Sequence, residues 1–298
     1  MVKIVVSNSI NNKKLDRFIL DTFPNLSRNN LFKAFRQKDI KLNGKRISSN
    51  TAIKTGDIIE IFIDDKLLNE KKETNSTRSA LDIVYEDNNI LIVNKKPGIQ
   101  VESETEDSLI KMAREYLKNN GDYAEPALCH RLDRNTGGLV IIVKNSEVLE
   151  IMLEKIKNRE VKKYYQCIII GCPNPKQAEL KHYLFKDSKK RQVYIYDTKR
   201  TGCVEIITKY KVLESGEEIS KLEVELVTGK THQIRAHLAH IGHPIVGDGK
   251  YGINSINKKF KAKHQMLWAY KIVFDFKEAG ILKYLDGKTF QRVCPLSL

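Results

Sequence analysis

The stretch ALCHRLDRNTGGLVIIVK, residues 127–144, decides how this chain folds. Its polar first half ends in Gly137 and Gly138 and runs directly into the apolar segment 139–143. That segment has the length and the β-branched content of a buried strand. Asp133 is therefore predicted to lie on a loop held by a core strand. An isolated aspartate in such a loop most often only caps a turn, so other parts of the chain must show whether this loop is a functional site.

Three later stretches favour a functional site, because each places reactive side chains at or beside a predicted strand. They are KYYQCIIIG at residues 163–171, KLEVELVTGKTHQIRAH at residues 221–237, and IGHPIVGDGKYG at residues 241–252. The first predicts a strand closed by glycine, with Tyr165, Cys167 and Ile169 on one face. The second begins with an alternating strand pattern and ends in a basic and polar segment.

Taken together, in this order and spacing, these stretches closely resemble the RluA/RluD type of RNA pseudouridine synthases over residues 81–298. In that family His-Arg-Leu-Asp-x-x-Thr-x-Gly carries the catalytic aspartate and Lys-x-Tyr carries an active-site tyrosine. The family motif Thr-Gly-Arg/Lys-Thr-His-Gln-Ile-Arg-x-His carries an arginine that pairs with the aspartate. The resemblance therefore implies Asp133, Tyr165 and Arg235 as the catalytic residues.

The chemistry of such an enzyme explains why these residue types are needed. Conversion of uridine into pseudouridine breaks the bond from N1 of the base to the ribose, rotates the uracil and rejoins it through C5. The reaction requires an ionised carboxylate, as nucleophile or as base, and acid–base help for the proton that leaves C5. A neighbouring guanidinium keeps the carboxylate charged and in a fixed plane. No atoms or electrons are gained, so no cofactor is expected, and the chain has no dinucleotide or Walker fingerprint.

Further residues are expected to contact RNA. Around the loop aspartate they are His130, Arg131, Arg134, Lys163 and Lys230. Near the start of the chain they are Lys33, Arg36, Lys41 and Lys45. The family equivalent of Arg131 suggests that it fills the gap left when the uridine leaves its stack, and a plain phosphate contact is the alternative. Three positions depart from the family: Gly137 replaces a usual serine, Lys96 a proline and Trp268 a histidine.

Composition supports a nucleic-acid partner. The net charge of +15 attracts a polyanion. No apolar run approaches the roughly 18 residues of a membrane span, and the first residues lack a signal-peptide pattern, so a cytoplasmic protein without membrane contact is expected.

The cysteines and histidines do not predict a metal site. The five cysteines are an odd number without a Cys-x-x-Cys pair, which argues against disulfides and zinc ribbons. His237, His240 and His243 are spaced by three, and the first two could meet as ligands on adjacent helical turns. No Cys, Asp or Glu near them along the chain completes a tetrahedral set, so no metal is expected.

The chain is predicted to form a small basic RNA-binding domain at 1–64, a flexible linker at 65–80 and a catalytic domain at 81–298. Residues 1–64 carry 12 Lys and Arg against 6 Asp and Glu, a net charge of +6. Helices are expected from residue 14 and from a Ser27 cap, and strands at 40–45 and 56–63, the first ending in an Asn-Gly turn. This arrangement resembles the RNA-binding domain named after ribosomal protein S-four.

The catalytic domain is predicted to be α+β, with a mixed, mainly antiparallel sheet. A hairpin is expected at 83–93 and helices at 108–117 and 147–156. After residue 160 strands dominate, without the regular alternation of strands and helices that builds a doubly wound sheet.

The proteins that share this resemblance and an added N-terminal domain mostly act on large-subunit ribosomal RNA, so 23S RNA is the expected target and transfer RNA the alternative. A non-catalytic RNA-binding or ribosome-assembly factor would have the same basic charge, but binding alone does not require Asp133, Tyr165 and Arg235. An aspartate-based hydrolase or nuclease would need a second carboxylate or a metal cluster.

Overall fold

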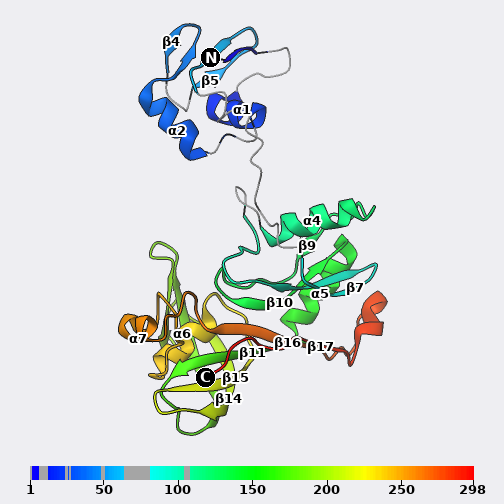
Figure 1. Ribbon diagram of the computed structural model, residues 1–298. Helices are drawn as coiled ribbons and strands as arrows, with labels where there is room; N and C mark the ends of the chain where they lie inside the picture. Colours follow the sequence, from blue (N-terminus) through cyan, green and yellow to red (C-terminus); the bar gives the residue numbers. More distant parts are fainter. Residues whose placement is uncertain are drawn as a thin grey trace. The chain divides into compact units, whose positions relative to one another are not determined.

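The computed structural model describes residues 2–6, 13–23, 26, 28–47, 51–63, 81–103 and 108–298 (Figure 1). The chain divides into two compact units, residues 1–80 and residues 81–298. The predicted linker at 65–80 and the predicted cap at Ser27 lie outside the described residues.

The first unit packs two helices against a small sheet. Its sheet has the order β1-β6-β3-β4, and a separate short pair joins β2 to β5. The bounds are β1 Val2–Val5, β2 Lys13–Lys14, β3 Ile40–Leu42, β4 Lys45–Arg46, β5 Ala52–Ile53 and β6 Ile58–Ile61, with helices α1 Leu15–Thr22 and α2 Arg28–Gln37. The buried residues Leu15, Ile19, Leu31 and Ile59 belong to one core cluster, so the helical apolar faces predicted from periodicity are confirmed.

The turn between β3 and β4 is the predicted Asn-Gly turn. Asn43 and Gly44 have φ angles of 51° and 77°, which a tight hairpin of this type requires. The Asn43 side chain also accepts a hydrogen bond from the backbone N–H of Ile58 at 2.8 Å and donates to Asp57 at 2.9 Å. These bonds tie the turn to the closing strand β6.

The second unit is built on an eleven-stranded sheet. Its main path is β13-β12-β14-β15-β11-β16-β10-β8-β7, with β17 added beside β16 and β9 beside β10. The bounds are β7 Ile83–Glu86, β8 Ile90–Lys95, β9 Ala127–Leu128, β10 Gly137–Val143, β11 Val161–Ile170, β12 Gln177–Asp187, β13 Gln192–Tyr196, β14 Val204–Ser215, β15 Ile219–Leu226, β16 Leu267–Phe274 and β17 Thr289–Gln291. Its strand pairings are antiparallel except that of β10 with β16, so the predicted mixed, mainly antiparallel α+β fold is confirmed.

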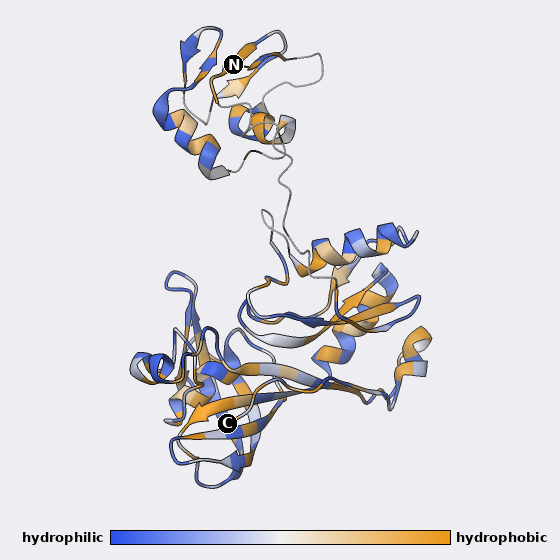
Figure 2. Ribbon diagram, viewed as in Figure 1, coloured by the Kyte–Doolittle hydropathy of each residue, from blue (hydrophilic) through white to orange (hydrophobic). Residues whose placement is uncertain are grey.

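Helices flank this sheet. They are α4 Leu109–Asn119, α5 Ser146–Lys157, α6 Gln233–His240 and α7 Asn254–Lys259, with a 3-10 helix, η1, at Gly280–Leu285. Helices α4 and α5 match the expected segments, and Figure 2 shows apolar and polar residues alternating along α4. None of the helices in the described ranges is long and apolar enough to cross a membrane.

Strand β10 is the centre of the second unit. All seven of its residues are buried, as its apolar sequence predicts. It pairs with β8 on one side and, in parallel, with β16 on the other. Its first two residues face Trp268 and Ala269, and neither glycine position has room for a side chain. A Cβ atom on Gly137 would overlap the Trp268 ring, and one on Gly138 would overlap the backbone of Ala269.

Candidate active site

Asp133 lies on the loop that connects β9 to β10, as the sequence predicts. The loop turns at Thr136, whose backbone N–H donates to the carbonyl of Asp133 at 3.1 Å. The Thr136 hydroxyl is buried and accepts a hydrogen bond from Gln265 at 2.7 Å. The buried bond between Gln265 and Thr136 thus fixes the short turn that carries Asp133. A quarter of the Asp133 side chain is exposed.

A buried lysine ties this loop to a second one. The Nζ atom of Lys95 donates to three backbone carbonyls, those of Lys96 at 3.1 Å, Ile99 at 2.9 Å and Arg134 at 3.0 Å. Burial lowers the pKa of Lys95 to about 8, and the negative charge of Asp133 opposes this change. The three carbonyl acceptors replace the water that the ammonium group loses on burial. Lys95 therefore joins the residue that follows Asp133 to the segment after β8.

Arg235 reaches Asp133 from helix α6. The helix begins at Gln233 directly after His232, which has a left-handed backbone conformation with φ of 53°. The Nη1 atom of Arg235 donates to Oδ2 of Asp133 at 2.8 Å, although 102 residues separate the two. The structure thus brings together the aspartate and the arginine that the sequence predicts as partners.

A second carboxylate, which the sequence analysis did not identify, holds the arginine. Arg235 donates from Nε to Oδ2 of Asp248 at 2.6 Å and from Nη2 to Oδ1 at 2.9 Å. Asp248 is fully buried, and its Oδ1 also accepts from the backbone N–H groups of Lys250 and Tyr251. Asp248 lies in the stretch 241–252, where the dipeptide Gly-Asp is the one sequence feature that could have identified it.

The charges of this group stabilise one another. Burial disfavours the guanidinium of Arg235, but Asp248 and then Asp133 outweigh burial and raise its pKa. Burial likewise disfavours the carboxylate of Asp248, but the hydrogen bond and charge of Arg235 keep its pKa low. The site therefore holds an arginine that stays charged between two aspartates.

Tyr165 lies on β11 with only 4% of its surface exposed. Burial, and then the negative charge of Asp133, raise its pKa. The hydroxyl is therefore protonated at neutral pH. Cys167 and Ile169 are buried in the same core cluster as Tyr165, in agreement with the predicted strand face.

A cavity of about 870 Å³ opens above these residues. It is lined by all eight of the site residues predicted for this unit: His130, Arg131, Asp133, Arg134, Lys163, Tyr165, Lys230 and Arg235. Arg131, Arg134 and Lys230 are exposed, and burial lowers the pKa of Lys163. The cavity thus combines two accessible carboxylates, Asp133 and Glu205, with several cationic groups, and the excess of positive charge suits a phosphate-bearing ligand.

His130 differs from the other basic residues of the cavity. Burial, followed by the charge of Lys163, lowers the pKa of His130 to about 3. Its Nε2 atom accepts a hydrogen bond from the backbone N–H of Ile141 at 2.9 Å. The ring is therefore neutral and anchors the loop to β10, and its geometry does not support a cationic phosphate contact.

Comparison with known proteins identifies the family of this chain. Residues 89–240 match the family model of the RNA pseudouridylate synthases. The chain is 31% identical to the ribosomal large subunit pseudouridine synthase C of Rickettsia bellii, over 96% of this chain and 97% of that protein. It is 30% identical to an uncharacterised RNA pseudouridine synthase of Mycoplasma genitalium, over 91% of this chain and 88% of that protein. The solved structure of human RNA pseudouridylate synthase domain containing 4 has the same fold, with a TM-score of 0.58 and 21% identity over 72% of this chain and 88% of that one.

The fold and the family match together define an RNA-modifying isomerase. The chain belongs to the RNA pseudouridylate synthase family, and it is an RNA pseudouridine synthase.

Proposed function

We propose that this enzyme converts specific uridines of large-subunit ribosomal RNA into pseudouridine, with Asp133 as the carboxylate that acts on the flipped-out nucleotide. The observation that carries the catalytic part is the ion pair of Asp133 with Arg235 at the floor of a cationic cavity. The pair occupies Oδ2 of Asp133, and within the described residues Oδ1 has no hydrogen-bond partner. That oxygen is available to the ribose or the base.

Arg235 has a defined part in this proposal. A carboxylate in a closed site tends to take up a proton, and the guanidinium counters that tendency by preferring the charged form. Because Arg235 is itself held by Asp248, it keeps its direction when the substrate enters. Asp133 is thereby kept ionised and oriented, which both nucleophilic attack and proton abstraction require.

The basic residues that line the cavity are proposed to bind the RNA and to stabilise the flipped-out uridine. Moving a uridine out of its stack costs a few kcal/mol. Arg131 is exposed at the cavity and is proposed to occupy the place that the base leaves. Arg134, Lys163 and Lys230 are proposed to contact the flanking phosphates, which positions the strand but does not select its sequence.

The first unit is proposed to anchor the RNA. Lys33, Arg36 and Lys45 are exposed on α2 and β4, and Nζ of Lys41 lies 4.9 Å from the centre of the Phe62 ring. Phe62 itself is 42% exposed, so a stacking surface lies beside a cation. Basic residues interleaved with exposed aromatic rings suit single-stranded or looped RNA. This supports the proposed likeness to the S-four-type domain.

Large-subunit ribosomal RNA is the proposed target because the Rickettsia relative, which matches almost the whole chain, bears that name. An enzyme with this target would work in the cytoplasm.

The test compares pseudouridine maps of ribosomal and transfer RNA from cells with and without the gene. The deletion is complemented with the wild type or with Asp133→Asn, which removes a charge but little volume. We expect pseudouridines of the large-subunit RNA to disappear and to return only with the wild type. Loss confined to transfer RNA would refute the target, and restoration by Asp133→Asn would refute Asp133 as the catalytic group. Unchanged maps together with defective ribosome assembly would favour a non-catalytic factor.

A further inference from the structure

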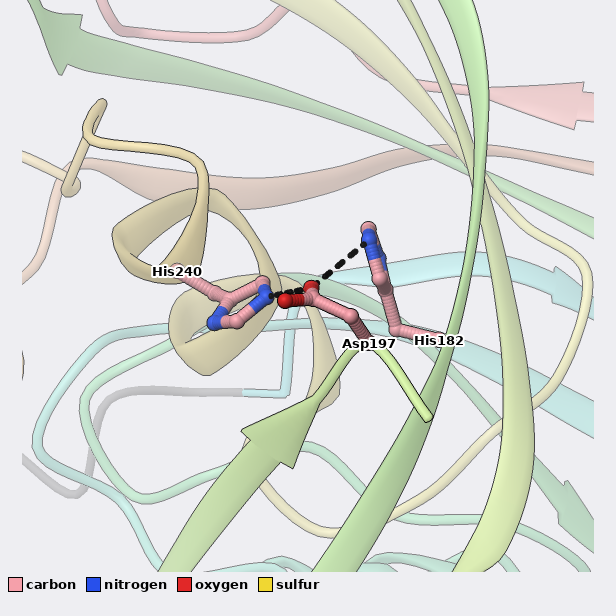
Figure 3. A group of neighbouring side chains, drawn as sticks. All are labelled: His182, Asp197 and His240. Atoms are coloured by element: carbon pink, nitrogen blue, oxygen red, sulfur yellow. Dashed lines mark hydrogen bonds and ion pairs between the residues drawn. The ribbon is translucent and has the colours of Figure 1, made fainter. Parts of the chain in front are cut away.

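A group of three side chains outside the cavity has the composition of a metal site (Figure 3). His182 lies on β12, Asp197 directly follows β13, and His240 is the last residue of α6. Oδ1 of Asp197 lies 2.7 Å from Nε2 of His240 and 3.6 Å from Nε2 of His182. Figure 3 shows the carboxylate between the two imidazole rings. All three ligand atoms lie within 4.8 Å of one another.

These separations fit a tetrahedral ion. With metal–ligand bonds of about 2.0 to 2.2 Å, two ligand atoms of a tetrahedral zinc site are roughly 3.3 Å apart. The distances of 2.7 and 3.6 Å bracket that value, so small side-chain rotations would suffice. Two imidazoles and one carboxylate form a donor set that suits Zn²⁺ and similar divalent ions, with water in the fourth position.

A buried chain of hydrogen bonds orients one of the ligands. Nδ1 of His182 lies 2.7 Å from Nε2 of His237, and Nδ1 of His237 lies 2.9 Å from the hydroxyl oxygen of Thr208. His237 and Thr208 are fully buried. When His237 donates from Nδ1 to Thr208 it accepts at Nε2 from His182, which leaves Nε2 of His182 free to bind a cation. Histidine ligands of metals are commonly fixed by such a second hydrogen bond.

We propose that His182, Asp197 and His240 bind one Zn²⁺ or a chemically similar divalent ion. The ion would join β12, the segment after β13 and the C-terminal end of α6. Helix α6 also carries Arg235, so the ion would secure the element that presents the arginine to Asp133. Its role is structural, because none of the three ligands lines the cavity. Asp197 lies 43 residues from His240 along the chain, so no local motif predicts that the two side chains meet.

The experiment titrates chelator-treated full-length protein with Zn²⁺ against a competing chromophoric chelator. We expect one ion per chain. At a free concentration about one hundred times Kd, binding should raise the melting temperature of the second unit by about 5 to 10 °C. The Co²⁺-loaded protein should show the visible absorption of a four-coordinate ion.

Substitutions separate this site from other metal binding. Asp197→Asn and His240→Gln should each abolish the tight site, and folding is not at risk for Asp197→Asn because that side chain is 78% exposed. Thr208→Val should weaken binding about tenfold by releasing the histidine chain. The matched control His264→Gln, an exposed histidine elsewhere, should bind like the wild type.

Two results would overturn the proposal. One is the absence of saturable binding below about 1 mM zinc. The other is equal zinc binding by the wild type and Asp197→Asn. That result would mean that Asp197 only forms ion pairs with His182 and His240. The readout is metal binding, so the result is independent of the proposed roles of Asp133 and of the RNA target.

Discussion

Asp248 occupies two of the three nitrogen atoms of the Arg235 guanidinium and leaves only Nη1 directed at Asp133. Because Asp248 is fully buried and bonded to two backbone N–H groups, it sets the plane of the arginine. The orientation of Asp133 therefore depends on a residue that does not line the cavity.

Asp248→Asn should lower kcat about one hundredfold with little change in KM. An amide accepts only one of the two guanidinium bonds, so Arg235 tilts, and misplacement of about 1 Å at a reacting group costs roughly this factor. The variant should also lose about 3 kcal/mol of unfolding free energy, because the buried guanidinium of Arg235 loses the negative charge of Asp248. Tritium release from RNA labelled at C5 of uridine measures the rate. The control is Asp275→Asn, which removes a charge from an exposed ion pair. Normal turnover by Asp248→Asn would contradict the positioning role.

Tyr165→Phe should lower kcat by about one hundredfold and leave RNA affinity almost unchanged. The substitution keeps the ring but removes a hydroxyl that is protonated at neutral pH. We propose that this hydroxyl assists the transfer of the proton that leaves C5. Single-turnover tritium release and a filter-binding assay separate the two effects. Loss of affinity with an unchanged rate would instead assign the Tyr165 hydroxyl to RNA binding, and no change in either would leave Tyr165 a role through its ring alone.

Gly137→Ser should destabilise the second unit by about 3 kcal/mol, because the added side chain overlaps the Trp268 ring. The same substitution should cost less than about 1 kcal/mol in a Trp268→His background, where the smaller ring makes room. This result would make Gly137 and Trp268 one complementary pair. Urea unfolding of the wild type, both single variants and the double variant measures the coupling. Additive effects would show that the contact does not determine the glycine.

The unfolding free energy should fall as the pH drops below about 6.5. His130 is neutral when folded, with a pKa of about 3, whereas an unfolded histidine takes up a proton near 6.5. Between these values the unfolded chain binds more protons, so acid favours unfolding, by at most about 1.4 kcal/mol per pH unit from this residue. His130→Gln should flatten the slope between about pH 6.5 and 5. His237 also has a pKa of about 3, but it is present in both proteins. The difference between their two slopes therefore reports on His130 alone. Identical slopes would show that His130 is protonated in the folded state.

Removal of residues 1–80 should weaken binding of structured RNA most at low salt. We assume that Lys33, Arg36, Lys41 and Lys45 each contact one phosphate. The slope of log K against log salt should then become less negative by roughly 3, at about 0.7 per contact. Replacement of the four by glutamine in the full chain is the matched variant and should give the same change. Turnover of a short RNA at saturation should persist, because binding outside the reacting centre acts mainly on affinity. An unchanged salt slope in both proteins would refute the anchor.

Local sequence patterns predicted much of this protein. The apolar run after Gly138, the alternation around Leu222 and Val224, and the helical spacing in residues 108–117 each identified an element that the structure contains. The Asn-Gly dipeptide at Asn43 predicted its turn. These features are readable because strand and helix periodicities, and the glycine requirement of a positive φ, act within a few neighbouring residues. Asp133 and Arg235 were paired by resemblance to a family.

Tertiary structure alone decided which distant residues meet. It placed Asp248 behind Arg235, three backbone carbonyls around Lys95, and Trp268 over Gly137. It also brought Asp197 between His182 and His240. None of these contacts leaves a local periodicity, because each joins segments through the order of strands in the sheet. In particular, the parallel pairing of β10 with β16, which no hairpin can produce, determines the close approach at the glycines beside the catalytic loop.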